Sequence, residues 1–324
     1  MLDRIFTVRV QRVRELTPEV RALELVHPAG RPLPGYSAGA HIDVELPGGF
    51  RRSYSLARAP DGGQAASYLI GVKREAAGRG GSAAVHARVA EGDLLAVGTP
   101  RNTFPLHADA PHHLLLAGGI GLTPLLAMAQ QLQRDGRACT LAVFARSRAH
   151  LAFADELAAL GSSCRLHLDE PADAPKLDIA SLLRSAAPGA HLYLCGPAGF
   201  MRASLDAAAA AGYGDERVHL EYFAPPDTAA AAGNDEPFVL HLALRGIDVP
   251  VAADQSAVDA LHDLGIDVPT SCEQGVCGTC VVGWRADGSG EPAHRDHCLS
   301  STERGHKVAL CCSRAKTGRL VVEL

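Results

Sequence analysis

The feature that most constrains this chain is a group of three closely spaced cysteines near its C-terminal end. Cys272, Cys277 and Cys280 have the spacing C-x4-C-x2-C, which is the plant-type signature of a [2Fe–2S] cluster. Gly275 and Gly278 lie between them, where a loop that wraps a cluster needs small residues. A structural zinc site usually combines two separated Cys or His pairs, and this stretch has one C-x2-C pair. The spacing therefore predicts a cluster-binding loop, and a zinc site is the alternative.

A fourth thiolate must come from further along the chain. Cys311 and Cys312 follow the apolar run Val308–Leu310, which predicts a strand that holds a thiolate rigidly. Since side chains alternate along a strand, we expect one of the two cysteines to bind and the other to point to the opposite face. Periodicity does not choose between them. Cys298 is nearer in sequence, but it lies in a polar stretch with charged neighbours.

The charge balance and the hydropathy argue against several classes of protein. Lys and Arg number 31 and Asp and Glu number 36, so the formal net charge is −5. A nucleic-acid partner is not expected, because it requires a basic surface. No apolar run reaches the ~18 residues of a membrane span, and the first residues have no signal-peptide pattern. We therefore expect a cytoplasmic protein with no membrane partner, in which thiols bind metal rather than form disulfides.

Hydrophobic periodicity changes between the first and second thirds of the chain. Residues 1–105 contain short alternating runs such as Ile42–Leu46, separated by turn residues, which predict an antiparallel β-barrel. In residues 106–225, continuous apolar runs such as Leu114–Ala117 precede segments of helical composition. This second pattern predicts an α/β domain with a parallel sheet and helices on both of its faces.

The last third follows a stretch without periodicity. Residues 226–236 are rich in alanine and turn residues, and their composition suits a linker. Residues 237–324 begin with two apolar runs around Gly246, which predict a hairpin. A short helix with Asp254 or Ser256 as its cap then leads into the cysteine loop. The chain is therefore expected to form three domains.

Two glycine turns are expected at one edge of the parallel sheet. The segment from Gly118 to Pro124 follows the first strand and opens a helix, where backbone amides and the helix dipole favour a phosphate. The segment Cys195–Pro197 follows another strand at the same edge. Both segments suit a nucleotide site. The alternative is a pair of tight packing turns, with Cys195 as a small buried hydrophobic residue.

Two segments of the first domain combine cationic, hydroxyl and aromatic groups. Arg51-Arg52-Ser53-Tyr54-Ser55 offers guanidinium groups and hydroxyls for a phosphate and a phenol ring for a flat ligand. Gly78-Arg79-Gly80-Gly81-Ser82 precedes a helix predicted over Ala83–Ala90 and suits a second phosphate cradle. The alternative for these segments is an exposed strand and a flexible loop.

A nucleotide site and an iron–sulfur cluster in one chain require an intermediary. A nicotinamide delivers two electrons as hydride, whereas a [2Fe–2S] cluster takes one electron at a time. A flavin handles both kinds of transfer. The motifs together predict a flavin in the barrel domain and a relay from a nicotinamide nucleotide through the flavin to the cluster.

The chain resembles the phthalate dioxygenase reductase family, which includes vanillate demethylase reductases, over its whole length and in the same domain order. Members are similar to ferredoxin–NADP reductases over the first two domains and to plant ferredoxins over the last. The resemblance therefore implies FMN in the barrel, NADH in the α/β domain and a [2Fe–2S] cluster in an α+β, β-grasp-like ferredoxin domain. It also implies that Cys311, the first cysteine of its pair, is the fourth ligand.

The resemblance implies site residues as well. The segments that match the FMN-binding ones contain Arg52, Ser53, Tyr54, Ser55, Gly71, Val72, Lys73, Arg79, Gly80, Gly81 and Ser82. The segments that match the nucleotide-binding ones contain Gly118, Gly119, Gly121, Thr123, Gly196 and Pro197. Cys195 and Phe223 take the catalytic positions, with Phe223 near the flavin. Arg146 keeps NADPH open as an alternative, because an arginine there suits a 2′-phosphate.

The function implied by this resemblance is that of a reductase in a two-component Rieske-type aromatic oxygenase. Electrons would pass from NADH through FMN and the cluster to the oxygenase, which is the expected protein partner. One alternative keeps this chemistry and replaces the acceptor by a haem-dependent monooxygenase. The other is a zinc-binding protein without enzymatic activity, whose glycine turns are structural.

Overall fold

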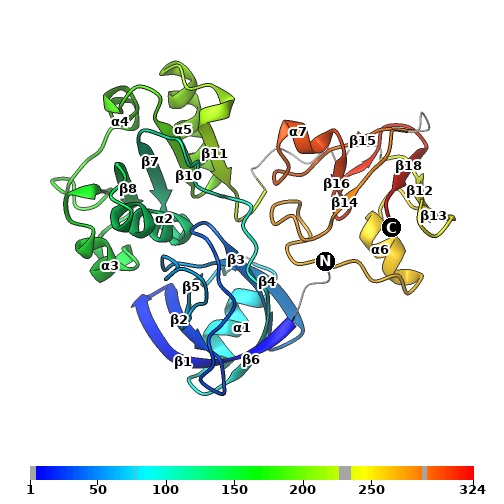
Figure 1. Cartoon of the computed structure of the whole chain (residues 1–324), viewed down its shortest axis with the longest axis horizontal. Helices are drawn as coiled ribbons and strands as arrows, with labels where there is room; N and C mark the ends of the chain where they lie inside the picture. The colour runs from blue at the N-terminus through cyan, green and yellow to red at the C-terminus, as the bar shows by residue number, and fades with distance from the viewer. Residues whose placement is uncertain (1–4, 77, 226–234, 287–289) are drawn as a thin grey trace. The chain divides into compact units, whose positions relative to one another are not determined.

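The computed structural model describes residues 5–76, 78–225, 235–286 and 290–324. The chain divides into two compact units, Met1–Phe223 and Ala224–Leu324, and Figure 1 shows the elements of each. Most of the predicted linker, residues 226–234, lies outside the described residues. The first unit contains both the barrel and the parallel sheet.

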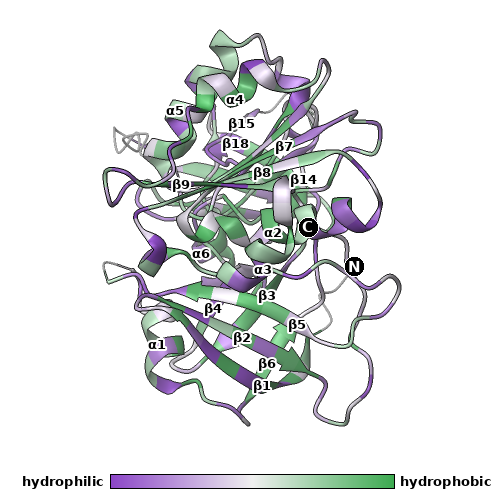
Figure 2. Cartoon of the chain, turned by 90° about the vertical axis from the view of Figure 1, so that its left-hand side faces the viewer, coloured by the Kyte–Doolittle hydropathy of each residue, from purple (hydrophilic) through white to green (hydrophobic). Residues whose placement is uncertain are grey.

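A six-stranded antiparallel sheet forms the first part of this unit. Its order is β4 (Phe50–Ser55), β3 (His41–Leu46), β6 (Leu94–Gly98), β1 (Ile5–Thr17), β2 (Val20–Val26) and β5 (Tyr68–Lys73). A bridge between Leu56 and Ile70 joins the two edges, so the barrel is nearly closed. Hydrophilic and hydrophobic residues alternate along β1 in Figure 2, as expected when one face is buried. Helix α1 (Gly81–Arg88) contacts β3, β4 and β5.

A five-stranded parallel sheet forms the second part. Its order is β11 (Val218–Glu221), β10 (His191–Cys195), β7 (His113–Gly118), β8 (Cys139–Ala145) and β9 (Cys164–Leu168). Two separate hydrophobic clusters cover its faces. One contains α2 (Leu122–Arg134) and α3 (Ala154–Ala159), and the other contains α4 (Ile179–Ser185) and α5 (Ala198–Ala210). Short 3₁₀ turns occupy Gly119–Gly121, Arg148–His150, Gly161–Ser163 and Asp215–Arg217.

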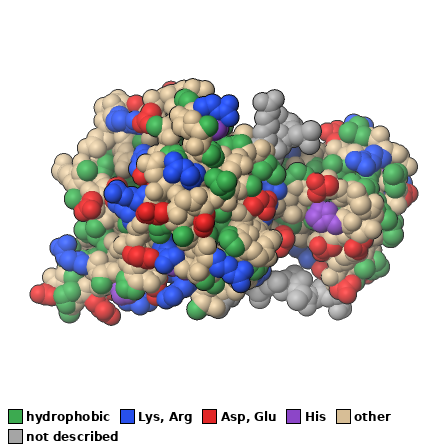
Figure 3. All heavy atoms as spheres, turned by 90° about the horizontal axis from the view of Figure 1, so that it is seen from below, with side chains coloured by type: hydrophobic (Ala, Val, Ile, Leu, Met, Phe, Trp, Pro, Cys, Tyr) green, Lys and Arg blue, Asp and Glu red, His purple; other side chains and the backbone are tan. Residues whose placement is uncertain are grey.

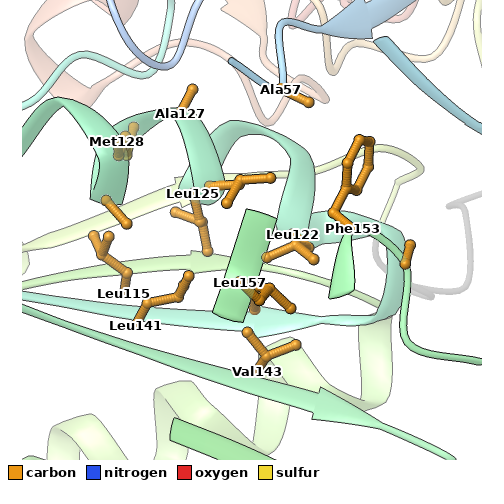
Figure 4. Close-up of a cluster of buried hydrophobic side chains, with 14 of the residues drawn as sticks. Ala57, Leu115, Leu122, Leu125, Ala127, Met128, Leu141, Val143, Phe153 and Leu157 are labelled. Atoms are coloured by element: carbon orange, nitrogen blue, oxygen red, sulfur yellow. The ribbon is translucent and has the colours of Figure 1, made fainter. Parts of the chain in front are cut away.

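The barrel and the parallel sheet share one hydrophobic core. Ala57, which follows the barrel strand β4, belongs to the same buried cluster as Leu122 and Leu125 of α2 and Phe153. Figure 4 shows these side chains converging above β7 and β8. Because both parts bury residues in this cluster, they form one compact unit.

The second unit is built on a hairpin and a helix. Strands β12 (Phe238–Leu242) and β13 (Ile247–Val251) form the predicted hairpin, and β18 (Arg319–Val322) pairs in parallel with β12. Helix α6 (Ala257–Asp263) packs on this sheet, and Ser256 caps it with a capping box. The remaining elements are β14 (Val281–Gly283), β15 (Pro292–Ala293), α7 (Ser301–Arg304), β16 (Lys307–Ala309) and β17 (Arg314–Ala315).

The strand predicted to carry the fourth thiolate is shorter than expected. Strand β16 ends at Ala309, and residues 310–312 form a turn in which the Ser313 amide donates to the Ala309 carbonyl at 3.1 Å. The ladder with β14 extends only as far as the pair Val281–Ala309, so the backbone turns where its partner strand stops. The argument from strand alternation for Cys311 and Cys312 is therefore wrong.

The surface and the helices have ordinary features. On the face drawn in Figure 3, Lys and Arg side chains are interspersed with Asp and Glu rather than gathered in a band. Among the residues that the structure describes, no helix is both long and apolar enough to cross a membrane.

Candidate functional site

The cysteine loop brings its thiols together with Cys311. The thiol of Cys272 hydrogen-bonds with those of Cys277 and Cys311, and the thiol of Cys280 hydrogen-bonds with Cys311. Cys311 therefore contacts thiols from both ends of the loop. These hydrogen bonds, with Cys277 first, lower the pKa of Cys272 below its usual range. A low thiol pKa favours the thiolate that binds metal.

Backbone and hydroxyl groups surround the same thiols. The amides of Gln274 and Val276 both donate to Cys272 Sγ at 3.4 Å, and Thr279 Oγ1 lies 3.0 Å from Cys277 Sγ. Such donors stabilise the charge that a sulfur atom carries when it binds iron. The four thiols touch in pairs. Over the described part of the chain, no group of three or more His, Cys, Asp or Glu side chains is arranged to hold one metal ion.

Cys312 occupies a different position from Cys311. Its Sγ lies 3.9 Å from the Ala309 carbonyl, and its thiol also contacts that of Cys311. A Cβ added to Gly275, which has φ +74°, would lie 2.5 Å from Cys312 Sγ. Cys312 therefore packs against the backbone of the loop at a position that requires glycine. On this observation, the residues that fit a cluster bound by four thiolates are Cys272, Cys277, Cys280 and Cys311.

The N-terminus of α1 forms a cradle together with Arg52. Gly80, with φ +86°, stands at the N-cap, and no side chain caps the helix, so its first amides are open to an anion. A Cβ on Gly81 would lie 2.9 Å from Arg52 Cγ, so the arginine side chain runs along the first turn. Arg52 Nη2 also donates to the Arg79 carbonyl at 3.4 Å. The cradle fits a phosphate group.

The other predicted residues of β4 have mixed surroundings. Ser53 Oγ donates to Asp43 Oδ1 at 2.5 Å, and Asp43 is buried between Arg51 and Arg101. The Ser53 hydroxyl thus belongs to an ion-pair network. Tyr54 is half-buried and packs against the barrel core. Ser82 lies on α1, and its Oγ accepts from the Glu75 amide at 3.1 Å.

The predicted segment Gly71-Val72-Lys73 contacts the protein itself. A Cβ on Gly71 would lie 2.9 Å from Thr123 Cγ2, so this glycine permits close packing of the barrel on α2. The Val72 carbonyl lies 3.0 Å from His86 Nε2, and Lys73 pairs with Glu75 at 2.7 Å. Thr123, which is buried, donates its hydroxyl to the Ile120 carbonyl at 3.1 Å.

The two glycine turns pack backbone against backbone. A Cβ on Gly121 would lie 2.3 Å from the Cys195 carbonyl oxygen, and one on Gly196 would lie 3.0 Å from Gly118 Cα. Close packing therefore explains these three glycines. Gly119 has φ +54° and open space beside it, so its backbone alone faces outward. Pro197 stands at the N-cap of α5.

A buried hydroxyl, a thiol and a carboxyl meet at the carboxyl end of the sheet. Ser55 Oγ lies 3.1 Å from Glu221 Oε2, and Glu221 pairs with Cys195 across β10 and β11. Burial raises the pKa of Glu221 to about 8, against the effect of the Ser55 hydrogen bond. Burial and the Glu221 carboxyl raise the pKa of Cys195, so its thiol is neutral. Phe223 follows at the end of the unit and is 41% exposed.

Sequence reasoning selected Ser55 and Cys195 but gave Glu221 no role. The available signal was its place, since it is a carboxylic acid that ends a strand at the edge where the glycine turns lie. Ligands of open α/β sheets bind beyond the carboxyl ends of the strands. An acid at such an end is therefore a candidate for proton transfer.

A cavity of about 720 Å³ lies beyond the carboxyl ends of β8 and β9. Ser147, Arg148, Glu170 and Asp173 are among the residues that line it. The predicted Arg146 is exposed, and its carbonyl accepts from the Glu170 amide at 2.7 Å. The cavity therefore presents one guanidinium and two carboxylates.

Comparison with known proteins matches two segments of the chain to family models. Residues 99–218 match the dimethylamine monooxygenase subunit DmmA-like N-terminal domain, and residues 240–316 match the 2Fe-2S iron-sulfur cluster binding domain. Vanillate O-demethylase oxidoreductase of Pseudomonas sp. (strain HR199) is 42% identical over 321 residues, which cover 98% of this chain and 99% of that protein. The haem-dependent oxidative N-demethylase beta subunit of Ectopseudomonas mendocina is 39% identical, with 100% of both chains covered.

The solved structure of phthalate dioxygenase reductase is also similar. It is 36% identical, the match covers 99% of this chain and 98% of that one, and the TM-score is 0.71. That protein is described as a modular structure for electron transfer from pyridine nucleotides to [2Fe–2S]. With relatives of this identity along almost its whole length, the chain belongs to the phthalate dioxygenase reductase and vanillate O-demethylase reductase family.

Proposed function

We propose that this chain is the NADH-dependent reductase component of a Rieske-type aromatic oxygenase. The observation that carries the proposal is the thiol group in the second unit, where Cys311 contacts both Cys272 and Cys280. This group fits a [2Fe–2S] cluster, and the cradle of the first unit fits the phosphate of FMN. A bound flavin would supply the link between hydride transfer and one-electron transfer.

Arg52 and the open amides of α1 would hold the flavin phosphate. Ser55 and Glu221 would handle a proton beside the flavin. Since the pKa of Glu221 is about 8, its carboxyl is mostly protonated at neutral pH and donates or accepts a proton near that pH. Cys195 contributes a neutral, buried surface at the same edge.

The cavity beyond β8 and β9 favours NADH over NADPH. A carboxylate at such an edge accepts hydrogen bonds from the ribose hydroxyls and repels a 2′-phosphate, whereas an arginine attracts that phosphate. Glu170 and Asp173 outnumber Arg148 among the charged lining residues. We therefore expect a higher kcat/KM for NADH than for NADPH in a steady-state assay.

The spectrum of the purified protein tests the assignment. The protein should be reddish-brown, with flavin and iron–sulfur absorption, and NADH should bleach both under anaerobic conditions. A colourless protein that contains zinc would support the alternative of a non-enzymatic zinc protein.

The fourth ligand has its own test. Cys311→Ser should abolish the iron–sulfur absorption and retain the flavin, because Cys311 contacts thiols from both ends of the loop. Cys312→Ser is the matched control and should retain the cluster, because Cys312 packs against Gly275. Loss of the cluster in Cys312→Ser alone would assign the ligand to that residue instead.

A haem-dependent oxygenase is the second candidate partner, favoured by the similarity to the haem-dependent demethylase subunit. The two partners are distinguished by reconstitution with a vanillate-type Rieske oxygenase and, separately, with a haem-dependent demethylase. NADH-driven product formation with the haem enzyme alone would replace the Rieske assignment.

A further inference from the structure

A segment outside the cysteine loop packs directly on it. This strap comprises residues 294–300 and precedes α7. The His297 amide donates to the Gly275 carbonyl at 2.8 Å. A Cβ on Gly275 would lie 3.0 Å from Asp296 Cα. The backbone of the strap therefore touches the loop at the glycine that Cys312 also contacts.

Asp296 is the centre of the strap. It is 1% exposed, and its carboxylate accepts from the Leu299 amide at 3.0 Å. The carboxylate also lies 3.3 Å from His294 Nδ1 and 3.6 Å from Arg304 Nη2. Arg304 Nη2 donates to the Asp296 carbonyl at 2.5 Å as well. These contacts tie the strap to α7.

The carboxylate of Asp296 lies beside a further thiol, since Cys298 Sγ is 4.0 Å from Asp296 Oδ2. It acts electrostatically on Cys298, which is half-buried on the strap. Cys298 in turn lies within electrostatic range of Cys272 and Cys280. A negative charge in a poorly solvated region acts strongly over such distances. Asp296 is therefore linked to the loop thiols through Cys298 and through its backbone contact with Gly275.

We propose that Asp296 is a positioning residue for the cluster site, which fixes the strap on the cysteine loop and holds a buried negative charge there that lowers the reduction potential of the cluster. The inference rests on the proposed [2Fe–2S] cluster. Reduction adds one negative charge to the cluster, so a nearby carboxylate opposes it and a nearby guanidinium favours it.

The test is a redox titration of the holoprotein, followed by its iron–sulfur absorption, in three variants. Asp296→Asn keeps the shape and an oxygen for the Leu299 amide and removes the charge. The reduction potential of the cluster in this variant should rise by about 59 mV, which corresponds to a tenfold change in the equilibrium of a one-electron reduction. Arg304→Gln removes the opposite charge, so the reduction potential of the cluster in this variant should fall. The corresponding change in the reduction equilibrium should be only a few-fold, because Arg304 is more exposed than Asp296.

Asp248→Asn is the matched control. Asp248 also pairs with one histidine and one arginine, His241 at 2.6 Å and Arg319 at 3.2 Å, but on the sheet of β12, β13 and β18. The reduction potential of the cluster in Asp248→Asn should equal that of the wild type. An unchanged potential in Asp296→Asn, or shifts of the same sign in Asp296→Asn and Arg304→Gln, would overturn the role of the charge.

If Asp296→Asn fails to assemble a cluster, Arg304→Gln decides alone, since only a fall in potential agrees with the inference. The outcome is also separable from that of the proposed function. A wild-type protein without iron–sulfur absorption would refute the proposed function, whereas a normal spectrum with an unaltered potential in the variants would refute only the role of Asp296.

Discussion

At the scale of single residues, the carboxyl of Glu221 shows how its surroundings alter the chemistry of a group, because burial raises its pKa to about 8. Sequence reasoning placed Ser55 and Cys195 in the site from motifs, because hydroxyls, thiols and glycine turns have recognisable spacing. It gave Glu221 no role, because burial alters the proton affinity of this carboxyl and burial depends on neighbours from β4 and β10. Those neighbours lie far away in sequence.

The raised pKa of Glu221 predicts a pH dependence of stability. The pKa of about 8 in the folded chain lies above the usual 4.5. The protonated carboxyl therefore makes its full contribution to the free energy of unfolding below pH 4.5, and this contribution is lost as the pH rises towards 8. Glutamine at position 221 has no proton to lose in this range. The free energy of unfolding of Glu221→Gln should therefore exceed that of the wild type by about 1–3 kcal/mol at pH 8.5, after a discount for partial exposure. Thermal unfolding of the flavin-free chain at pH 5 and 8.5 measures this difference.

Ser55→Ala serves as the companion variant in that experiment. Its hydroxyl lowers the pKa of Glu221, so its removal should make the loss of stability with rising pH steeper than in the wild type. Parallel pH profiles for the wild type and Glu221→Gln would show that the carboxyl does not titrate between these limits.

At the scale of elements, the side chain of Arg52 can lie along the first turn of α1 because Gly81 has no Cβ. Sequence reasoning found both segments but could not pair them, since 27 residues separate Arg52 from Arg79 and only the barrel brings them together. It also overestimated β16, because an apolar run does not reveal where the partner strand ends. Local pattern thus predicted these elements, and pairing between distant segments decided their limits.

Two substitutions test the cradle. Arg52→Ala should weaken flavin retention by about 1.5–3 kcal/mol, or roughly ten- to a hundredfold in affinity, because a charged phosphate contact is lost. Gly81→Ala should also weaken it, because the new Cβ would lie 2.9 Å from Arg52 Cγ and displace that side chain. Flavin occupancy after dialysis at low protein concentration is the measurement.

Gly199→Ala is the control for the glycine substitution, since a Cβ there has open space around it. It should retain flavin as the wild type does. Wild-type occupancy in Arg52→Ala would place the phosphate elsewhere.

At the scale of the whole molecule, the chain divides into two compact units, and the first of them contains both the barrel and the parallel sheet. Residue patterns separated the barrel from the parallel sheet, because alternating apolar runs give way to continuous apolar runs between them. They could not show that Ala57 and α2 share one core, since periodicity shows that a face is buried and not what covers it. The boundary between the units, at Phe223 and Ala224, lies close to the start of the predicted linker at 226.

This division predicts that the first unit works without the second. A fragment that ends near Ala230, outside the described residues, retains the shared core of the barrel and the parallel sheet, so it should fold, keep FMN and reduce ferricyanide with NADH. It lacks all four clustered thiols and should therefore fail to drive the oxygenase, while the full chain should support both reactions. The two rates, measured side by side at equal flavin concentration, test the order of the relay. If the fragment drove the oxygenase at the rate of the full chain, electrons would leave from the first unit, and the cysteine loop would have no part in their transfer.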